Sequence, residues 1–196
     1  MTPHEAPTTS ERYGLPPVEI QVQLVRLYFE NINSWFPIID AESLWTKLFG
    51  PSMSEPNILM YAIVAAASRF LPATVMTRAK RDYYHISAAQ KIMLLSFEMP
   101  TLDSLEAMII MAVDVVGTSN GPKCWAIMSM ICSISLRLGI NRNSSSIFGT
   151  LTPSASSSIS AKSISTTGVP IIDPIDFAIE ERKRMLFWGA YVLDRF

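Results

Sequence analysis

Apolar residues recur every three to four positions through most of the chain, which is the spacing of one face of an α-helix. Pro, Gly and capping residues such as Asp40 divide this pattern into separate segments. The expected helices cover residues 18–32, 41–49, 57–71, 74–98, a stretch from Thr101 or Asp103 to Gly117, 122–138 with Gly139 as its C′ residue, and 180–196. The pattern predicts an all-α, multi-helix bundle-like domain.

Two of these segments indicate how the helices pack. The helix at 57–71 is rich in alanine, so neighbouring helices can approach it closely, and we expect it to be central. The helix at 74–98 carries an apolar stripe that we expect to face the core. Its members are Met76, Ala79, Tyr83, Ile86, Met93 and Phe97.

The final helix carries a charged head, Glu181 to Arg184, and an aromatic body that we expect to dock into the core through Trp188. It contains apolar residues up to Phe196 without a stop signal. We therefore expect a domain truncated at its C-terminus, with an exposed apolar surface. The expected contributors to that surface are Trp188, Val192, Leu193 and Phe196.

Two segments lack the apolar residues that a packed element needs. Residues 1–16 form a polar, Pro-containing lead, and residues 143–168 contain ten Ser and four Thr against one charged residue, Lys162. We expect a disordered lead and a disordered insertion in a surface loop, with a regulatory phosphorylation segment as the alternative for the insertion. The predicted domain is a partial helical one over residues 17–196.

Composition narrows the classes of function. The chain is 49% hydrophobic and 17% charged with a net charge of −1, and its basic residues are not clustered as DNA binding by this chain alone would require. Its longest apolar run, from Ile58 to Ala67, is too short for a membrane span, so no membrane partner is expected. The two cysteines, Cys124 and Cys132, lie about 12 Å apart along one helix and are expected to be buried reduced thiols. No metal site or cofactor is expected in this chain.

One catalytic pattern and one charged residue need weighing. Residues Gly117 to Gly121 match the G-x-S-x-G elbow of serine hydrolases, but the preceding segment has helical spacing and no His follows Ser119. A helix-turn-helix connection is the expected structure, and a hydrolase fragment is a remote alternative.

Asp114 interrupts an apolar stretch near a helix C-terminus, where a carboxylate is disfavoured. It is expected to be exposed, with a ligand anchor or a salt-bridge partner as the alternative.

Four stretches, in order, resemble the fungal-specific transcription factor domain, the middle homology region of zinc binuclear-cluster regulators. Residues 28–40 contain its aromatic-proline turn, 63–70 its Ala-rich helix, 125–143 its Trp-containing helix, and 181–195 its Glu-x-Arg-Arg and Leu-Asp-Arg signature. The signature positions, which the resemblance makes structural, are Phe36, Pro37, Trp125, Gly139, Glu181, Arg182, Arg184, Trp188, Asp194 and Arg195. Asn141 stands where the family usually has His.

The resemblance implies a non-enzymatic regulatory domain that acts in the nucleus and modulates transcription, by sensing a small-molecule effector or by intramolecular inhibition. Its partners would be co-regulators or other segments of a transcription factor. The family's six-cysteine zinc cluster is absent from these residues, so zinc and DNA would be bound only by a separate module. A non-enzymatic helical scaffold or adaptor is the alternative.

Overall fold

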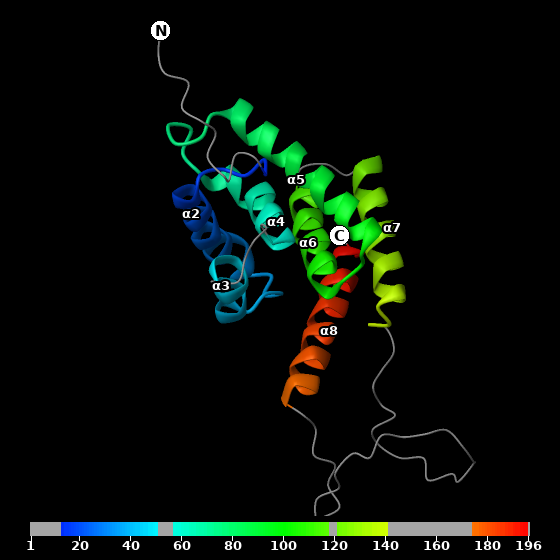
Figure 1. Ribbon diagram of the computed structural model, residues 1–196. Helices are drawn as coiled ribbons and strands as arrows, with labels where there is room; N and C mark the ends of the chain where they lie inside the picture. Colours follow the sequence, from blue (N-terminus) through cyan, green and yellow to red (C-terminus); the bar gives the residue numbers. More distant parts are fainter. Residues whose placement is uncertain (1–12, 51–56, 118–120, 141–173, 196) are drawn as a thin grey trace, which may run out of the picture.

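The computed structural model describes residues 13–50, 57–117, 121–140 and 174–195. In these ranges the chain forms helices and no strand. Their order is α2 (Val18–Tyr28), the π-helical turn η1 (Phe29–Asn33), α3 (Ala41–Phe49), α4 (Ile58–Ala67), the 3-10 turn η2 (Ser68–Phe70), α5 (Arg78–Glu98), α6 (Leu102–Val116), α7 (Pro122–Arg137) and α8 (Pro174–Leu193) (Figure 1). The all-α prediction is confirmed.

Side-chain caps set where several helices begin. Asp40 accepts a hydrogen bond from the Ser43 backbone nitrogen at 2.8 Å, as predicted, and Thr101 forms a reciprocal capping box with Ser104. Thr77 caps α5, which therefore begins at Arg78 rather than at residue 74. Gly139 follows α7 with a φ of 65°, the left-handed geometry of a helix C′ residue.

Helix α4 is the centre of the bundle. Every residue from Leu59 to Ala67 is buried, which is the expected state of a helix that is apolar on all sides. It packs against α2, α5 and α6, and Figure 1 shows it between α2 and α6. Helix α6 in turn packs against α5, α7 and α8, so α4 and α6 together carry most of the core.

Helix α5 buries a different face from the one predicted. Its buried residues are Tyr84, Ala88, Ile92 and Ser96, which recur at four-residue spacing toward α4 and α6. The predicted stripe is largely exposed, with Phe97 at 77%. Both faces contain apolar residues, but the small Ala88 and Ser96 permit close helix contact, and hydrophobicity alone did not distinguish the two.

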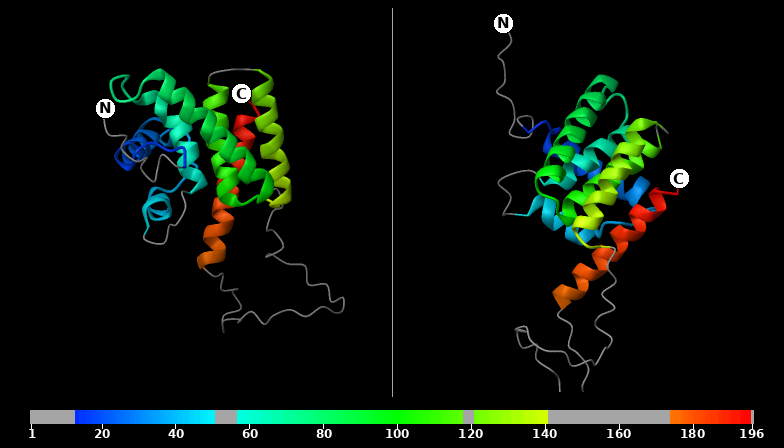
Figure 2. Two further views of the ribbon diagram at one scale, coloured as in Figure 1. Left: turned by 45° about the horizontal axis from the view of Figure 1, so that its top comes forward. Right: turned by 90° about the vertical axis from the view of Figure 1, so that its right-hand side faces the viewer.

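Helix α8 starts at Pro174, six residues earlier than predicted, and both views of Figure 2 show its beginning extending past the other helices. It contacts the core through Leu186, Gly189 and Leu193. A Cβ at Gly189 would lie 3.2 Å from Cγ2 of Ile38, so this glycine allows close approach to the turn before α3. Trp188 is 55% exposed, and the prediction that α8 docks through it is wrong.

The predicted surface at the end of α8 is only partly right. Trp188 and Val192 are exposed, but Leu193 is buried and Phe196 lies outside the described residues. Leu193 points inward because it lies on the helical face of Leu186, seven residues earlier. The predicted lead also differs: residues 1–12 are not described, but Leu15 is buried and Tyr61 donates a hydrogen bond to the Tyr13 carbonyl at 3.0 Å.

Helix α7 covers one side of α6 with four buried residues, Ile127, Met128, Ile131 and Ile134. Cys124 is half-buried and Cys132 is exposed, so the expectation of two buried thiols is wrong for Cys132. The reason is that Cys132 follows Ile131 and so points about 100° away from the buried face. The predicted insertion at 143–168 lies outside the described residues.

Candidate functional site

Two acidic side chains lie in the first half of α6, a helix of mostly apolar residues. Asp103 and Glu106 are three residues apart and therefore point to the same side. The positive end of the helix dipole favours the carboxylate of Asp103, which lies in the first turn. Glu106 is nevertheless buried, so its charge needs a partner.

Arg182 of α8 supplies that partner across the bundle. Its Nε donates to Oε1 of Glu106 at 3.0 Å, and its Nη2 pairs with Oε2 of the same carboxylate and with Oδ1 of Asp103. Lys47 of α3 donates to Oδ1 of Asp103 at 3.0 Å. This charge network, consisting of Lys47, Asp103, Glu106 and Arg182, joins three helices that are distant in the sequence.

Two opposing effects set the pKa values in the network: burial disfavours the charged forms, and pairing with opposite charges favours them. Burial raises the pKa of Glu106 above its ordinary value, although the Arg182 guanidinium opposes the change. For Asp103, burial also disfavours the charge, but hydrogen bonds from Arg182 and Lys47 outweigh it and lower the pKa. The pKa of Arg182 is raised, because its two carboxylate partners outweigh its own desolvation.

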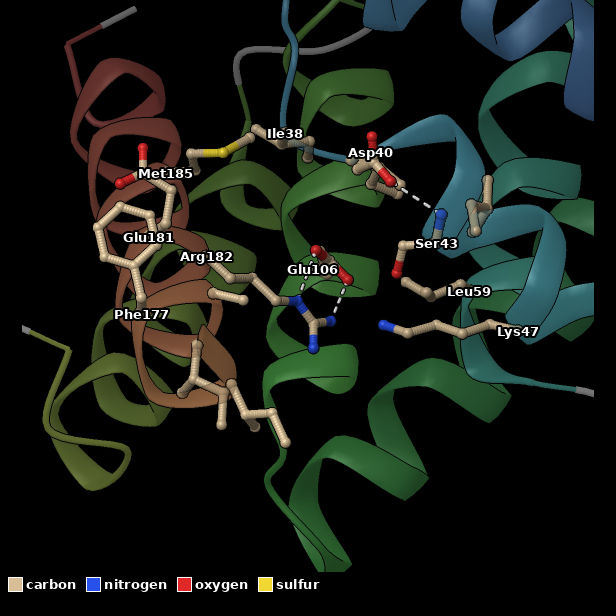
Figure 3. A pocket seen from close by; sticks show the side chains of 15 residues that line it. Ile38, Asp40, Ser43, Lys47, Leu59, Glu106, Phe177, Glu181, Arg182 and Met185 are labelled. Atoms are coloured by element: carbon tan, nitrogen blue, oxygen red, sulfur yellow. Dashed lines mark hydrogen bonds and ion pairs between the residues drawn. The ribbon is translucent and has the colours of Figure 1, made fainter. Parts of the chain in front are cut away.

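A cavity of about 720 Å³ lies beside this network, between α3 and the first half of α8. Figure 3 shows Lys47 and Arg182 reaching toward each other from α3 and α8, with Glu106 at their side. The apolar part of the wall includes Ile38, Leu44, Leu59, Phe177, Ile179 and Met185. An apolar hollow of this size with a few convergent charges is typical of a small-molecule binding site.

A second charged cluster lies near the C-terminal end of α6. Asp114 is 6% exposed, and its carboxylate pairs with Arg69 of η2 and lies 2.8 Å from Nε2 of His85 on α5. Arg69 Nη2 also donates to the Asp114 carbonyl at 3.2 Å. The expectation of an exposed Asp114 is therefore wrong, because α5 and η2 bring cationic and hydrogen-bonding groups to this end of the helix.

The surroundings of His85 favour its neutral form. Burial lowers its pKa, and the nearby charges of Arg69 and Lys123 lower it further, against a smaller opposing effect of Asp82. The neutral ring can then donate its Nε2 hydrogen to Asp114.

The structure brings five signature residues to one groove of about 390 Å³ between the aromatic-proline turn and α8. These are Phe36, Pro37, Glu181, Arg184 and Trp188. Arg184 pairs with Glu181 at 3.0 Å on the surface, whereas Arg182 reaches the charge network. Trp125, by contrast, lies on α7 and is 75% exposed, away from this groove.

The remaining signature residues lie elsewhere. Gly139 ends α7, and Asp194 and Arg195 are exposed just after α8, where Arg195 stacks over the Tyr191 ring at 5.2 Å from its centroid. Residues 118–120 of the G-x-S-x-G pattern are outside the described residues, and the helix α6 precedes them where a hydrolase elbow requires a strand.

Within the described ranges, His, Cys, Asp and Glu do not gather into a group that could hold a metal ion. In the same ranges, none of the helices has the length and apolarity needed to cross a bilayer.

Comparison with known proteins places this arrangement in a family. The family described as "Fungal specific transcription factor domain" matches residues 25–196, which include the charge network, the groove and both ends of α6. The chain belongs to this family of transcription regulators. The matched range contains every signature residue, so the resemblance drawn from four short stretches is confirmed.

The chain is similar to longer fungal regulators. It is 23% identical over 188 residues to the Zn(2)-C6 fungal-type transcription factor FTF1c of Fusarium oxysporum f. sp. lycopersici, covering 93% of this chain and 18% of that protein. The corresponding values are 22%, 93% and 16% for FTF2 of the same organism, and 20%, 93% and 17% for a transcriptional regulatory protein of Schizosaccharomyces pombe. No solved structure matches the chain.

The ion pairs of the charge network around Arg182 were not predicted from the sequence. The sequence indicated Arg182 as a signature residue, but it did not predict that Asp103 and Glu106 pair with Arg182 or that Lys47 pairs with Asp103. One signal was present: Glu106 interrupts a run of apolar residues in a helix that was expected to be buried, and such a carboxylate requires a cation. Nothing in the sequence indicated which cation would reach it.

Proposed function

We propose that this chain is the regulatory middle domain of a longer nuclear transcription factor, in which zinc and DNA are bound by a module outside these 196 residues. The domain acts through the docking of α8, and a small-molecule effector in the cavity beside Arg182 changes that docking. Its relatives carry the Zn(2)-C6 name, and this chain spans less than a fifth of their length, which supports a division of labour between modules.

The observation that carries the proposal is the position of Arg182. It connects α8 to α6 and contributes to the wall of the adjacent cavity. A ligand that enters the cavity contacts α3 and α8 at once, so its binding energy depends on how the two helices are placed. Any ligand that binds one placement better than another shifts the equilibrium between them.

The charges of the network favour a regulatory use over catalysis. The carboxylates of Asp103 and Glu106 are held by cations from two other helices, which is an arrangement that fixes helices relative to one another. A buried ion pair of this kind contributes more to choosing one arrangement of helices than to net stability.

A reporter assay tests the proposal. The chain is fused to an unrelated DNA-binding domain and expressed in a fungal host with a matching promoter, and transcription is compared with that of the DNA-binding domain alone. We expect transcription to change by at least threefold, and Arg182→Gln to reduce this change. Arg184→Gln is the matched control, because it removes the same charge from the exposed side of the same helix.

A cavity-filling variant tests the effector. Ala178 is exposed and contributes to the wall of the cavity, so Ala178→Trp fills the space without removing a core side chain. We expect it to alter reporter transcription while the thermal unfolding temperature stays within a few degrees of the parent. A fusion that is folded by circular dichroism but leaves transcription unchanged would contradict the regulatory role.

A further inference from the structure

A separate cavity of about 610 Å³ opens between the start of α5, η2 and the end of α6. Three arginines contribute to its wall, Arg69 from η2 and Arg78 and Arg81 from the first turns of α5. The other polar groups of the wall are Ser68, Asp82, His85 and Asp114. This cavity shares no residue with the one beside Arg182, so a test of one leaves the other intact.

The charge of this cavity is positive. Three arginines contribute to its wall against two acidic residues, Asp82 and Asp114. Asp114 is already paired with Arg69 and hydrogen-bonded to His85, so the acid at the floor of the cavity is neutralised by its own neighbours. The N-terminal end of α5 adds the positive end of its helix dipole.

Arg78 and Arg81 are placed to act together. They are three residues apart on α5 and therefore lie on one side of the helix. Nε of Arg81 donates to the Met76 carbonyl at 3.2 Å, which ties this side chain to the turn before α5 while it contributes to the wall of the cavity. Among the described residues, no ion pair involves Arg78 or Arg81.

We propose that Arg78 and Arg81 bind the phosphate group of a small polar molecule in this cavity. A guanidinium presents paired N–H donors that match the oxygens of a phosphate, and two of them suit a dianion better than the single charge of a carboxylate. The cavity is several times larger than a phosphate ion, and its polar side chains, Ser68 and Asp82, suit an organic part that carries hydroxyl groups. Arg69 positions the floor of the site by holding Asp114.

Calorimetric titration of the purified chain tests this site. The probes are inorganic phosphate and glycerol 2-phosphate, with acetate and glycerol as comparisons, all at one ionic strength set with sodium chloride. We expect saturable binding of both phosphates, binding of acetate at least fivefold weaker, and no binding of glycerol. The double variant R78Q/R81Q should weaken phosphate binding at least tenfold.

A second double variant with the same loss of charge distinguishes binding at this site from non-specific electrostatic attraction of anions to α5. K80Q/K91Q removes two positive charges from exposed positions of the same helix that are not part of the cavity wall, and should change phosphate affinity less than twofold. Equal weakening by the two double variants, or no saturable binding to the parent, would overturn the site. Binding of inorganic phosphate without glycerol 2-phosphate would overturn the small-molecule part of the proposal.

Discussion

The two ends of α6 carry buried carboxylates in opposite electrostatic settings. At the N-terminal end, Asp103 in the first turn gains from the helix dipole, and at the C-terminal end Asp114 is disfavoured by it. In the N-terminal network, the main cation is Arg182, which lies 76 residues after Glu106 in the sequence. Asp114 instead pairs with Arg69 and His85, which precede it by 45 and 29 residues. The first network thus fastens α8 to the bundle, and the second fastens α6 to its immediate neighbours.

Of the two charge clusters, the N-terminal one is better placed for regulation. Helix α8 packs against α6 and α7 and extends beyond the bundle at its start, so the N-terminal network can lose α8 while α4, α5 and α6 remain packed. The cluster at Asp114 joins α6 to η2 and α5, which pack directly against or beside α4, so its loss frees no separate helix.

The largest loss of stability should come from removing a packed side chain of α8, the helix that the N-terminal network holds. Leu186 is fully buried on α8, four residues after Arg182, and Leu186→Ala should lower the free energy of unfolding by about 3 to 4 kcal/mol because it leaves a cavity. Trp188→Ala should cost less than about 1 kcal/mol, since the ring is more than half exposed. Urea denaturation of both variants measures this, and equal losses would mean that α8 docks through both faces.

Removing the Arg182 charge should cause the second-largest loss of stability. Arg182→Ala leaves Glu106 buried without its partner and should cost about 3 kcal/mol, with Arg184→Ala costing less than about 0.5 kcal/mol as an exposed pair. The folded-state pKa of Glu106 is raised by burial, so the folded state binds a proton more readily than the unfolded state.

The raised folded-state pKa of Glu106 sets how the stability of Arg182→Ala should depend on pH. Stability linked to Glu106 is present below its unfolded pKa of about 4.3 and is lost as pH rises through the raised folded value. The deficit of Arg182→Ala should therefore shrink between pH 7 and pH 5. A deficit that grows toward pH 5 would contradict the assignment of Glu106 as the stranded charge.

The second region should respond less strongly. Asp114→Asn keeps the shape of the side chain and should cost about 2 kcal/mol, because the Arg69 side chain is 39% exposed and can regain water. Thermal unfolding at pH 7 measures the change. A loss larger than that of Arg182→Ala would reverse the order of the two ends.

The smallest effect concerns His85. Its folded pKa is lowered, so stability linked to it is present above the unfolded value of about 6.5 and is lost as pH falls. His85→Gln should change stability by less than about 1 kcal/mol at pH 7.5 and should flatten the fall in melting temperature between pH 7 and pH 5.5. An unchanged slope would mean that other groups cause the pH dependence.

Much of the fold was predictable from local signals. Helix starts were found where a side chain caps the backbone, as at Asp40, and helix ends where Pro or Gly follows. The central role of α4 followed from its uniform apolarity. The face of α5 was wrongly predicted because Tyr83 and Tyr84, adjacent in sequence, offer alternative apolar faces, and only the neighbouring helices favour Tyr84.

The helical class, the order of the helices, capping residues such as Asp40 and membership of the family could all be predicted from the amino-acid sequence. These features depend on periodicity and on short motifs that act within a few residues. Which charged side chains pair with one another depends on the packed fold. Arg182, Glu106 and Lys47 carry no local mark of their pairing, since a salt bridge between distant segments depends on where the packed helices bring the side chains. The same holds for Arg78 and Arg81, which the sequence offers as an exposed helix face and which the fold places around a cavity above a neutralised Asp114.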